Sequence, residues 1–261
     1  MIDMKGKRGL VMGVANDHSI AWGIARALHA AGAELAFTYQ GDAFGKRVKP
    51  LAASLGSDML IDVDVCDDAK LDAAFSEIAD RWGRLDFVIH AVAFSDKSEL
   101  TGRFVNTSRA NFKHSLDISC YSLIEIARRA APMMAEGGSL ITLTFEGSRR
   151  VMPHYNVMGV AKAALEASVR YLAADLGPDG IRVNAISPGP MKTLAGSAIG
   201  GARRTFKFAE ANAPMRANAT LDAIGGTALW LCSDAGASTT GEIVHVDGGY
   251  HVMGMPDPDN L

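Results

Sequence analysis

Seven short apolar runs lie along the chain, and each has the length and composition of a strand that is buried on both faces. They span residues 9–13, 35–39, 59–63, 87–90, 139–144, 181–186 and 243–246. The longer stretches between them carry apolar residues at helical spacing, and helices are expected at 20–31, 43–55, 69–82, 111–134 and 155–176. Strands and helices that alternate with short joins predict an α/β fold: a single Rossmann-like, doubly wound parallel sheet of about seven strands with helices on both faces.

The region 191–214 departs from this alternation, because it is a long insert between the sixth strand and the helix that follows. Joins of this length are commonly lids or binding loops, so a substrate-binding loop or helix is expected here. No linker, internal repeat or low-complexity segment divides the chain, and one dinucleotide-binding domain is expected over residues 1–261.

Composition and charge narrow the class of protein. Of the 261 residues, 48% are hydrophobic and 21% are charged, which suits a globular core. The net charge of −3 gives no general attraction to polyanions, so nucleic acid is not an expected partner. The first residues lead into a strand without a signal-peptide core, and no apolar run is long enough to cross a bilayer. A cytoplasmic protein without membrane contact is therefore expected.

The cysteines and histidines do not suggest a metal site. Cys66, Cys120 and Cys232 are odd in number and widely spaced, and reduced thiols are the simple interpretation. His154 has no second metal-type residue spaced with it. His90 ends an apolar run and is expected to be a packed, hydrogen-bonded side chain.

The loop after the first strand has the features of a phosphate site. In such a sheet, ligands bind beyond the carboxyl ends of the strands, near the switch point beside the first strand. Gly13 ends that strand, and Ser19 stands at the start of the next helix, where N–H groups and a hydroxyl suit a pyrophosphate. A serine that only caps the helix is the alternative.

Gln40 follows the second strand, where an acidic residue would hold a ribose, and a neutral amide with no arginine beside it favours NADH over NADPH. Asp64 ends the third strand, where adenine is expected.

Tyr155 and Lys162 are seven positions apart, close to two helical turns, so one helix can direct both side chains into one pocket. A lysine there is expected to favour the ionised form of the tyrosine, which makes it a better proton donor or oxyanion partner. A buried tyrosine with an unrelated surface lysine is the plain alternative. The place of the pair, after the fifth strand, favours the catalytic interpretation.

These residues resemble the bacterial enoyl-[acyl-carrier-protein] reductases, a divergent branch of the short-chain dehydrogenases/reductases. The likeness covers nearly the whole chain. The resemblance rests on four motifs: Gly13-Val14-Ala15 with Ser19-Ile20-Ala21, the block 155–162, Arg182-Val183-Asn184-Ala185-Ile186-Ser187 and Val246-Asp247-Gly248-Gly249. Ordinary members of the superfamily place the tyrosine four residues before the lysine, where this chain has Met158. The wider spacing is typical of the enoyl reductases.

The resemblance implies NADH-dependent reduction of the trans-2 double bond of enoyl thioesters on acyl carrier protein or coenzyme A, in fatty acid elongation, by a cytoplasmic homotetramer. Tyr155 would hydrogen-bond the thioester oxygen, and Lys162 would bind the nicotinamide ribose. The implied cofactor contacts are Gly13, Ser19, Ile20, Gln40, Asp64, Val65, Val92, Lys162, Met191, Lys192, Thr193, Leu194 and Ala195. The implied substrate contacts are Ser95, Phe145, Tyr155, Met158, Ile199 and Phe206.

The insert around 194–208 matches the family's mobile substrate-binding loop, with an ordinary amphipathic surface helix as the alternative. Arg203 and Arg204 within it are candidates to meet the acidic carrier protein. Two positions depart from the family pattern: Phe145 stands where a second tyrosine is usual, and Ala93 adds a methyl group in the same pocket. These changes suggest a specialised second copy of the enzyme, in which substrate range or sensitivity to diphenyl-ether inhibitors is altered.

Two rival functions remain open. One is a ketone/alcohol oxidoreductase of the same superfamily, such as a 3-ketoacyl reductase, which the spacing of Tyr155 and Lys162 and the absence of a serine at Phe145 both disfavour. The other is a nucleotide-binding sensor without catalysis. The intact pair argues against a sensor, whereas the lost hydroxyl at Phe145 leaves it possible.

Overall fold

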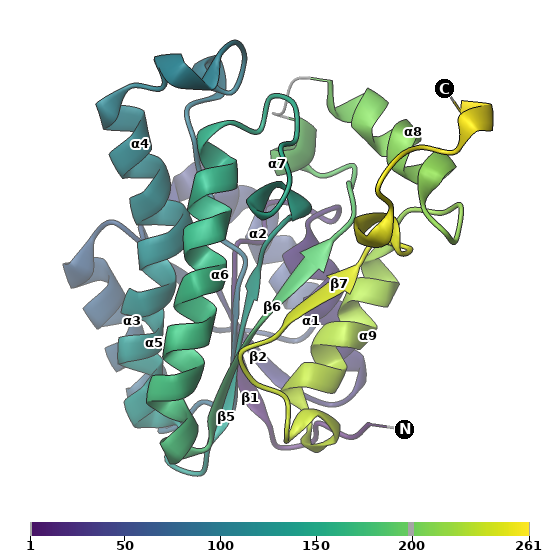
Figure 1. Ribbon diagram of the computed structural model, residues 1–261. Helices are drawn as coiled ribbons and strands as arrows, with labels where there is room; N and C mark the ends of the chain where they lie inside the picture. Colours follow the sequence, from purple (N-terminus) through teal and green to yellow (C-terminus); the bar gives the residue numbers. More distant parts are fainter. Residues whose placement is uncertain (1, 198–200, 261) are drawn as a thin grey trace.

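The computed structural model describes residues 2–197 and 201–260 and contains one parallel sheet wrapped by helices (Figure 1). In the described residues the sheet has seven strands in the order β3-β2-β1-β4-β5-β6-β7. The strands are β1 (Arg8–Met12), β2 (Glu34–Tyr39), β3 (Leu60–Asp62), β4 (Phe87–His90), β5 (Gly138–Leu143), β6 (Ile181–Pro188) and β7 (Ile243–Val246). Each lies within two residues of its expected bounds, and the predicted Rossmann-like α/β class is confirmed.

The helices cover both faces of the sheet. They are α1 (Ile20–Ala30), α2 (Gly41–Ser54), α3 (Asp68–Trp82), α4 (Arg109–Leu116), α5 (Ser122–Ala130), α6 (Val157–Leu176), α7 (Leu194–Ser197), α8 (Ala202–Asn212) and α9 (Leu221–Cys232). Side chains of α3, α5 and α6 share one buried apolar cluster with the sheet, and those of α1, α2 and α9 share another. Figure 1 shows α3, α5 and α6 on one side of the strands and α1 and α9 on the other.

The alternation of side chains along β1 explains why helices must cover both faces of the sheet. Leu10 and Met12 belong to the first cluster, whereas Val11 belongs to the second, and all three are at most 1% exposed. Successive side chains of a strand point to opposite faces, so a continuous apolar run requires helices on each. From β1 the sheet is built outward in two directions, through β2 and β3 on one side and through β4 to β7 on the other, so the switch point lies between β1 and β4. These two strands pair in parallel, from Gly9 opposite Phe87 to Met12 opposite His90.

The expected helix at 111–134 is wrong as a single element. It begins earlier, after the Ser108 side chain accepts the Asn111 N–H, and it breaks into α4, a π-helical turn η3 (Asp117–Tyr121) and α5. A short 3-10 turn that contains Pro132 follows α5. Proline lacks the N–H that an α-helix needs and clashes with the preceding turn, which accounts for the early end.

The insert 191–214 contains α7 and α8, which Figure 1 shows beyond the carboxyl ends of β6 and β7. Expected residue Ile199 lies outside the described residues. Within the part of the chain that the structure describes, no helix is both long and apolar enough to cross a membrane.

Candidate active site

The loop after β1 folds around Ser19. The Ser19 hydroxyl accepts the N–H groups of Ala15 and Asn16, both at 3.0 Å, and it makes no capping bond to α1. The interpretation of Ser19 as a simple capping residue is therefore wrong. Gly13 has φ 94°, and a Cβ there would lie 2.0 Å from the Ala91 carbonyl oxygen. Only glycine lets this loop pass so close to the end of β4.

Gln40 and Asp64 meet at the ends of β2 and β3. The Gln40 side-chain amide donates to Asp64 Oδ2 at 2.9 Å. Val65 and Val92 are partly buried against the apolar cluster on the α3, α5 and α6 side. Four residues expected at the cofactor thus line up along the carboxyl edge of the sheet, from β3 to β4.

Tyr155 lies before α6 and not within it, so the expectation of a helix from residue 155 is wrong. His154 and Asn156 have φ values of 64° and 42°, which interrupt a helical path, and α6 begins at Val157. Tyr155 is still 7% exposed and packs edge-to-face on Phe145, with ring centroids 5.1 Å apart. The turn before α6 therefore holds the tyrosine beside the end of β5.

Met158, one of the expected substrate contacts, is also buried here. It is 6% exposed, shares an apolar cluster with Tyr155, and its sulfur lies 3.8 Å from the Ser119 hydroxyl oxygen. Phe145 is packed against the same cluster. Three of the expected substrate residues therefore meet in one apolar wall.

Lys162 is 5% exposed, and its ammonium donates to the Leu143 carbonyl oxygen at 2.8 Å. Burial lowers the pKa of Lys162 from 10.5 to about 8, and the neighbouring Cys120 and Glu166 oppose this shift. Glu166, one turn further along α6, is 6% exposed and accepts the hydroxyls of Thr144 and Ser148. The lysine is thus held by a strand-end carbonyl at the base of the site.

The expected effect of Lys162 on the ionisation of Tyr155 is wrong. Burial raises the pKa of the Tyr155 phenol above its usual range, and the negative charge of Glu166 acts in the same direction. Loss of hydration disfavours the phenolate, and Lys162 is not among the causes of the shift. Tyr155 therefore keeps its proton at neutral pH.

His90 is the packed, hydrogen-bonded histidine that the sequence predicted. It is 1% exposed, and its ring nitrogens lie 2.9 Å from Thr142 Oγ1 and 2.8 Å from Ser122 Oγ. Burial, together with the nearby charge of Lys162, lowers its pKa from 6.5 to about 3. The ring is neutral at physiological pH and joins β4, β5 and α5.

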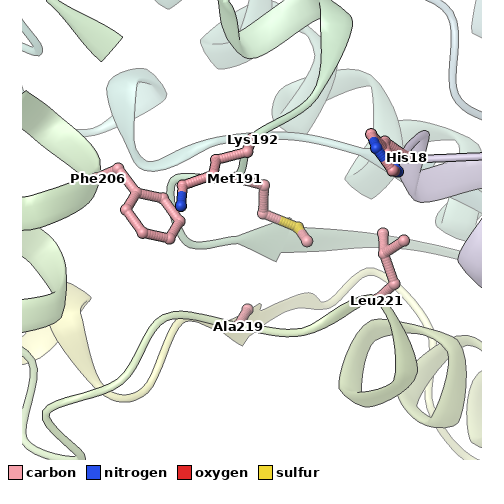
Figure 2. Close-up of a pocket in the computed structure, with 6 residues that line it drawn as sticks. All are labelled: His18, Met191, Lys192, Phe206, Ala219 and Leu221. Carbon is pink, nitrogen blue, oxygen red and sulfur yellow. The ribbon is translucent and has the colours of Figure 1, made fainter. Parts of the chain in front are cut away.

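A cavity of about 280 Å³ lies between the insert and the loop after β1. Figure 2 shows the side chains that line it, which are His18, Met191, Lys192, Phe206, Ala219 and Leu221. The Lys192 ammonium lies 4.5 Å from the centroid of the Phe206 ring. The cavity thus joins expected cofactor residues (Met191 and Lys192) to the expected substrate residue Phe206.

Four further expected residues are not among those that line the cavity. The Thr193 hydroxyl accepts the Gly196 N–H at 2.9 Å, which shapes the start of α7. Leu194 is 47% exposed, and Ala195 follows it in α7. Ser95, after β4, donates to Asn111 Oδ1 at 3.3 Å.

A family model described as enoyl-(acyl carrier protein) reductase matches residues 13–251. The chain belongs to the enoyl-[acyl-carrier-protein] reductase family. It is 60% identical over 258 residues to "Enoyl-[acyl-carrier-protein] reductase [NADH] 2" of Rhizobium meliloti (strain 1021), which covers 99% of this chain and 96% of that protein. It is 59% identical over 256 residues to the same organism's "reductase [NADH] 1", over 98% of this chain and 94% of that one.

A solved structure agrees with this assignment. The crystal structure of enoyl-(acyl-carrier-protein) reductase from Anaplasma phagocytophilum in complex with NAD is 57% identical and matches with a TM-score of 0.94, over 97% of each chain. This similarity places the seven-stranded fold described above within the reductase family.

Several residues at the site of this reductase-family chain were not predicted. His18 and Leu221 line the cavity, and Glu166 binds hydroxyls beside Lys162. Ser119, in the π-helical turn, accepts the Phe94 N–H at 3.0 Å and donates to the Phe94 carbonyl at 3.1 Å. Single-turn π-helices often occur at functional sites, but no sequence pattern signalled this one. For Glu166 the available signal in the sequence was an acidic residue four positions after Lys162, on the same face of the expected helix.

Proposed function

We propose that this protein catalyses the NADH-dependent reduction of the trans-2 double bond of enoyl thioesters carried by acyl carrier protein, in fatty acid biosynthesis. The observation that carries the proposal is Tyr155, buried beside Phe145 at the end of β5 with Lys162 buried seven residues further on. Met158 occupies the position of the ordinary superfamily tyrosine. Relatives that match over nearly the whole chain bear the name of this activity with NADH.

The carboxyl edge of the sheet suits NADH. The cradle at Gly13, which a Cβ would fill, and the loop folded on Ser19 admit a pyrophosphate at the start of α1, where Ile20 lies. The bonded pair Gln40 and Asp64 is assigned to the adenosine end. The other proposed contacts are Val65, Val92, Lys162, Met191, Lys192, Thr193, Leu194 and Ala195. Bound NADH supplies the hydride that reduces the β-carbon of the enoyl thioester.

Tyr155 acts as a hydrogen-bond donor to the thioester oxygen, on which negative charge accumulates during reduction. Its raised pKa keeps the phenol protonated and able to donate. A donor placed against a developing oxyanion is typically worth about 10²- to 10³-fold in rate. Lys162 carries a positive charge below its pKa of about 8 and is assigned to the nicotinamide ribose hydroxyls, oriented by its bond to Leu143.

The substrate side is assigned to the apolar wall and the insert. Phe145, Met158 and Phe206 offer apolar surface to an acyl chain, and Ser95 lies at the entrance. The insert is proposed to close over the acyl chain and exclude water. Arg203 and Arg204 are exposed on α8, where they suit an acidic carrier protein.

The specialised-copy hypothesis rests on Phe145 and Ala93. Phe145 packs on Tyr155 without a hydroxyl of its own, so the hydrogen bond to substrate is left to Tyr155. Ala93 is exposed at the end of β4. We propose that activity is kept while substrate range or diphenyl-ether sensitivity differs. Rhizobium meliloti has two relatives that carry the same activity name with numbers 1 and 2.

We also propose a cytoplasmic homotetramer that needs no metal for the reduction. Large apolar side chains are exposed on the outer helices: Phe112 on α4 at 37%, Tyr121 on η3 at 50% and Val160 on α6 at 37%. Such a surface supports self-association, and size-exclusion chromatography with light scattering tests the assembly.

The function is tested by following NADH absorbance with purified protein and a crotonyl or longer trans-2-enoyl thioester. Turnover is expected, and Tyr155→Phe should lower kcat by about 10²- to 10³-fold. Tyr171→Phe is the matched control, because it removes the same hydroxyl from an exposed position on α6 and should leave kcat unchanged. Turnover of only 3-ketoacyl thioesters would establish the ketoreductase instead, and NADH binding without oxidation would establish a sensor.

A further inference from the structure

Cys66, His114 and Asp117 form an exposed cluster that borders the proposed adenosine end of the cofactor site. One sulfur, one ring nitrogen and one carboxylate oxygen from these residues all lie within 4.8 Å of one another. The Cys66 thiol donates to Asp117 Oδ2 at 3.6 Å. Cys66 follows β3, whereas His114 lies in α4 and Asp117 begins η3. Two separate segments thus bring three different ligating side chains together on the surface.

We propose that Cys66, His114 and Asp117 bind a divalent transition-metal ion, with Zn²⁺ the best match. Thiolate, imidazole and carboxylate are the three side-chain ligands of zinc, and its bonds to them are about 2.0 to 2.3 Å long. Ligand atoms around a tetrahedral zinc ion are therefore roughly 3.3 to 3.8 Å apart. Atoms already within 4.8 Å need to move by only about 1 Å each, and exposed side chains can do so by rotation. Water completes the fourth position.

The donor set selects against the common hard cations. Mg²⁺ and Ca²⁺ require several oxygen ligands, and this cluster offers one carboxylate with a sulfur and a nitrogen. Softer ligands favour zinc, cobalt and related ions. The chemistry of the three side chains therefore identifies the class of metal.

Neighbouring groups hold the ligands in place. The Phe94 ring meets the His114 ring edge-to-face, with centroids 5.2 Å apart, which limits the rotation of the imidazole. The Cys66 N–H donates to Asp64 Oδ1 at 3.0 Å, which fixes the turn that carries the thiol. Supporting contacts of this kind orient metal ligands and strengthen binding. The carboxylate of Asp64 also adds negative charge beside the site, which favours a cation.

The metal site does not depend on the proposed function, and its test measures metal binding alone. The full-length protein, freed of metal with a chelator, is titrated with Co²⁺ as a spectroscopic substitute and then with Zn²⁺ in competition. The wild type should show a thiolate-to-cobalt charge-transfer band with the strong visible bands of tetrahedral cobalt, and Zn²⁺ should remove both. Cys66→Ser should abolish the charge-transfer band.

His114→Ala and Asp117→Asn should each weaken Co²⁺ affinity by at least about tenfold, because even groups that only orient a ligand are worth about 10- to 100-fold. Cys120→Ser, at the buried cysteine of η3, and His29→Ala, at an exposed histidine of α1, are matched controls that should leave the spectrum and affinity unchanged. A wild type without the thiolate band, or a band that survives Cys66→Ser, would overturn the proposal. Affinity unchanged in both His114→Ala and Asp117→Asn would do the same.

Discussion

Gly13→Ala should destabilise the fold and weaken NADH binding, because Gly13 has neither the backbone conformation nor the space for a side chain. Its φ of 94° lies in the region that L-residues avoid, at a cost of about 1–2 kcal/mol. A Cβ would lie 2.0 Å from the Ala91 carbonyl oxygen. The Ala91 backbone is itself held in place, because its N–H donates to the Met12 carbonyl oxygen. Moving backbone to relieve such a contact costs about 1–3 kcal/mol. The free energy of unfolding should therefore fall by about 2–5 kcal/mol.

The measurement is guanidinium unfolding followed by tryptophan fluorescence at a fixed protein concentration, with NADH titration of the folded protein. Gly226→Ala is the matched control: nothing lies within 4 Å of a Cβ at this exposed position of α9. The same substitution there should raise stability by about 0.4–1 kcal/mol. A Gly13→Ala variant within about 0.5 kcal/mol of wild type, with unchanged NADH affinity, would refute the reasoning about close approach at this loop.

Three further predictions concern ionisation and specificity. His90 is neutral when folded because burial lowers its pKa from 6.5 to about 3, so its contribution to stability is complete above about pH 6.5 and is lost as the pH falls towards 3. The loss is up to about 1.4 kcal/mol per pH unit, and His90→Gln should reduce this slope in unfolding measurements; equal slopes would contradict it. Lys162 should lose its charge as the pH rises through about 8, so NADH affinity should fall over that range in the wild type and stay flat in Lys162→Met, as fluorescence titration can test. Phe145→Tyr should alter diphenyl-ether inhibition while kcat is retained, and unchanged kinetics and inhibition would remove any special role for this position.

The strands were predictable because a parallel strand that is buried on both faces requires apolar residues along its whole length. The run from Phe87 to His90, for example, has no other environment that suits four consecutive buried side chains. The helices were less predictable at their ends and interruptions. The π-helical turn at Asp117–Tyr121 contains no glycine or proline, and its Ser119 bonds to Phe94, which lies 25 residues away in sequence.

The candidate site also has features that the sequence predicts and features that only the folded chain reveals. Gly13, Ser19 and Lys162 were predicted as site residues from their positions relative to strands and helices, since the topology brings the carboxyl ends of the strands together. The state of Tyr155 was not, because its pKa depends on burial that only the folded chain creates. The Cys66 cluster was missed for a related reason: Cys66 and Asp117 are 51 residues apart, so spacing along the chain carries no sign of the contact.

Burial acts on Tyr155 and Lys162 in the same sense, since it favours the neutral form of each, and this defines what the pair can do. For the lysine, Cys120 and the negative charge of Glu166 raise the pKa against the effect of burial, which leaves it at about 8. The same carboxylate raises the pKa of Tyr155 further. At neutral pH the site therefore holds a protonated phenol and a charged ammonium together. Such a pair is suited to donate a hydrogen bond and to anchor a ligand.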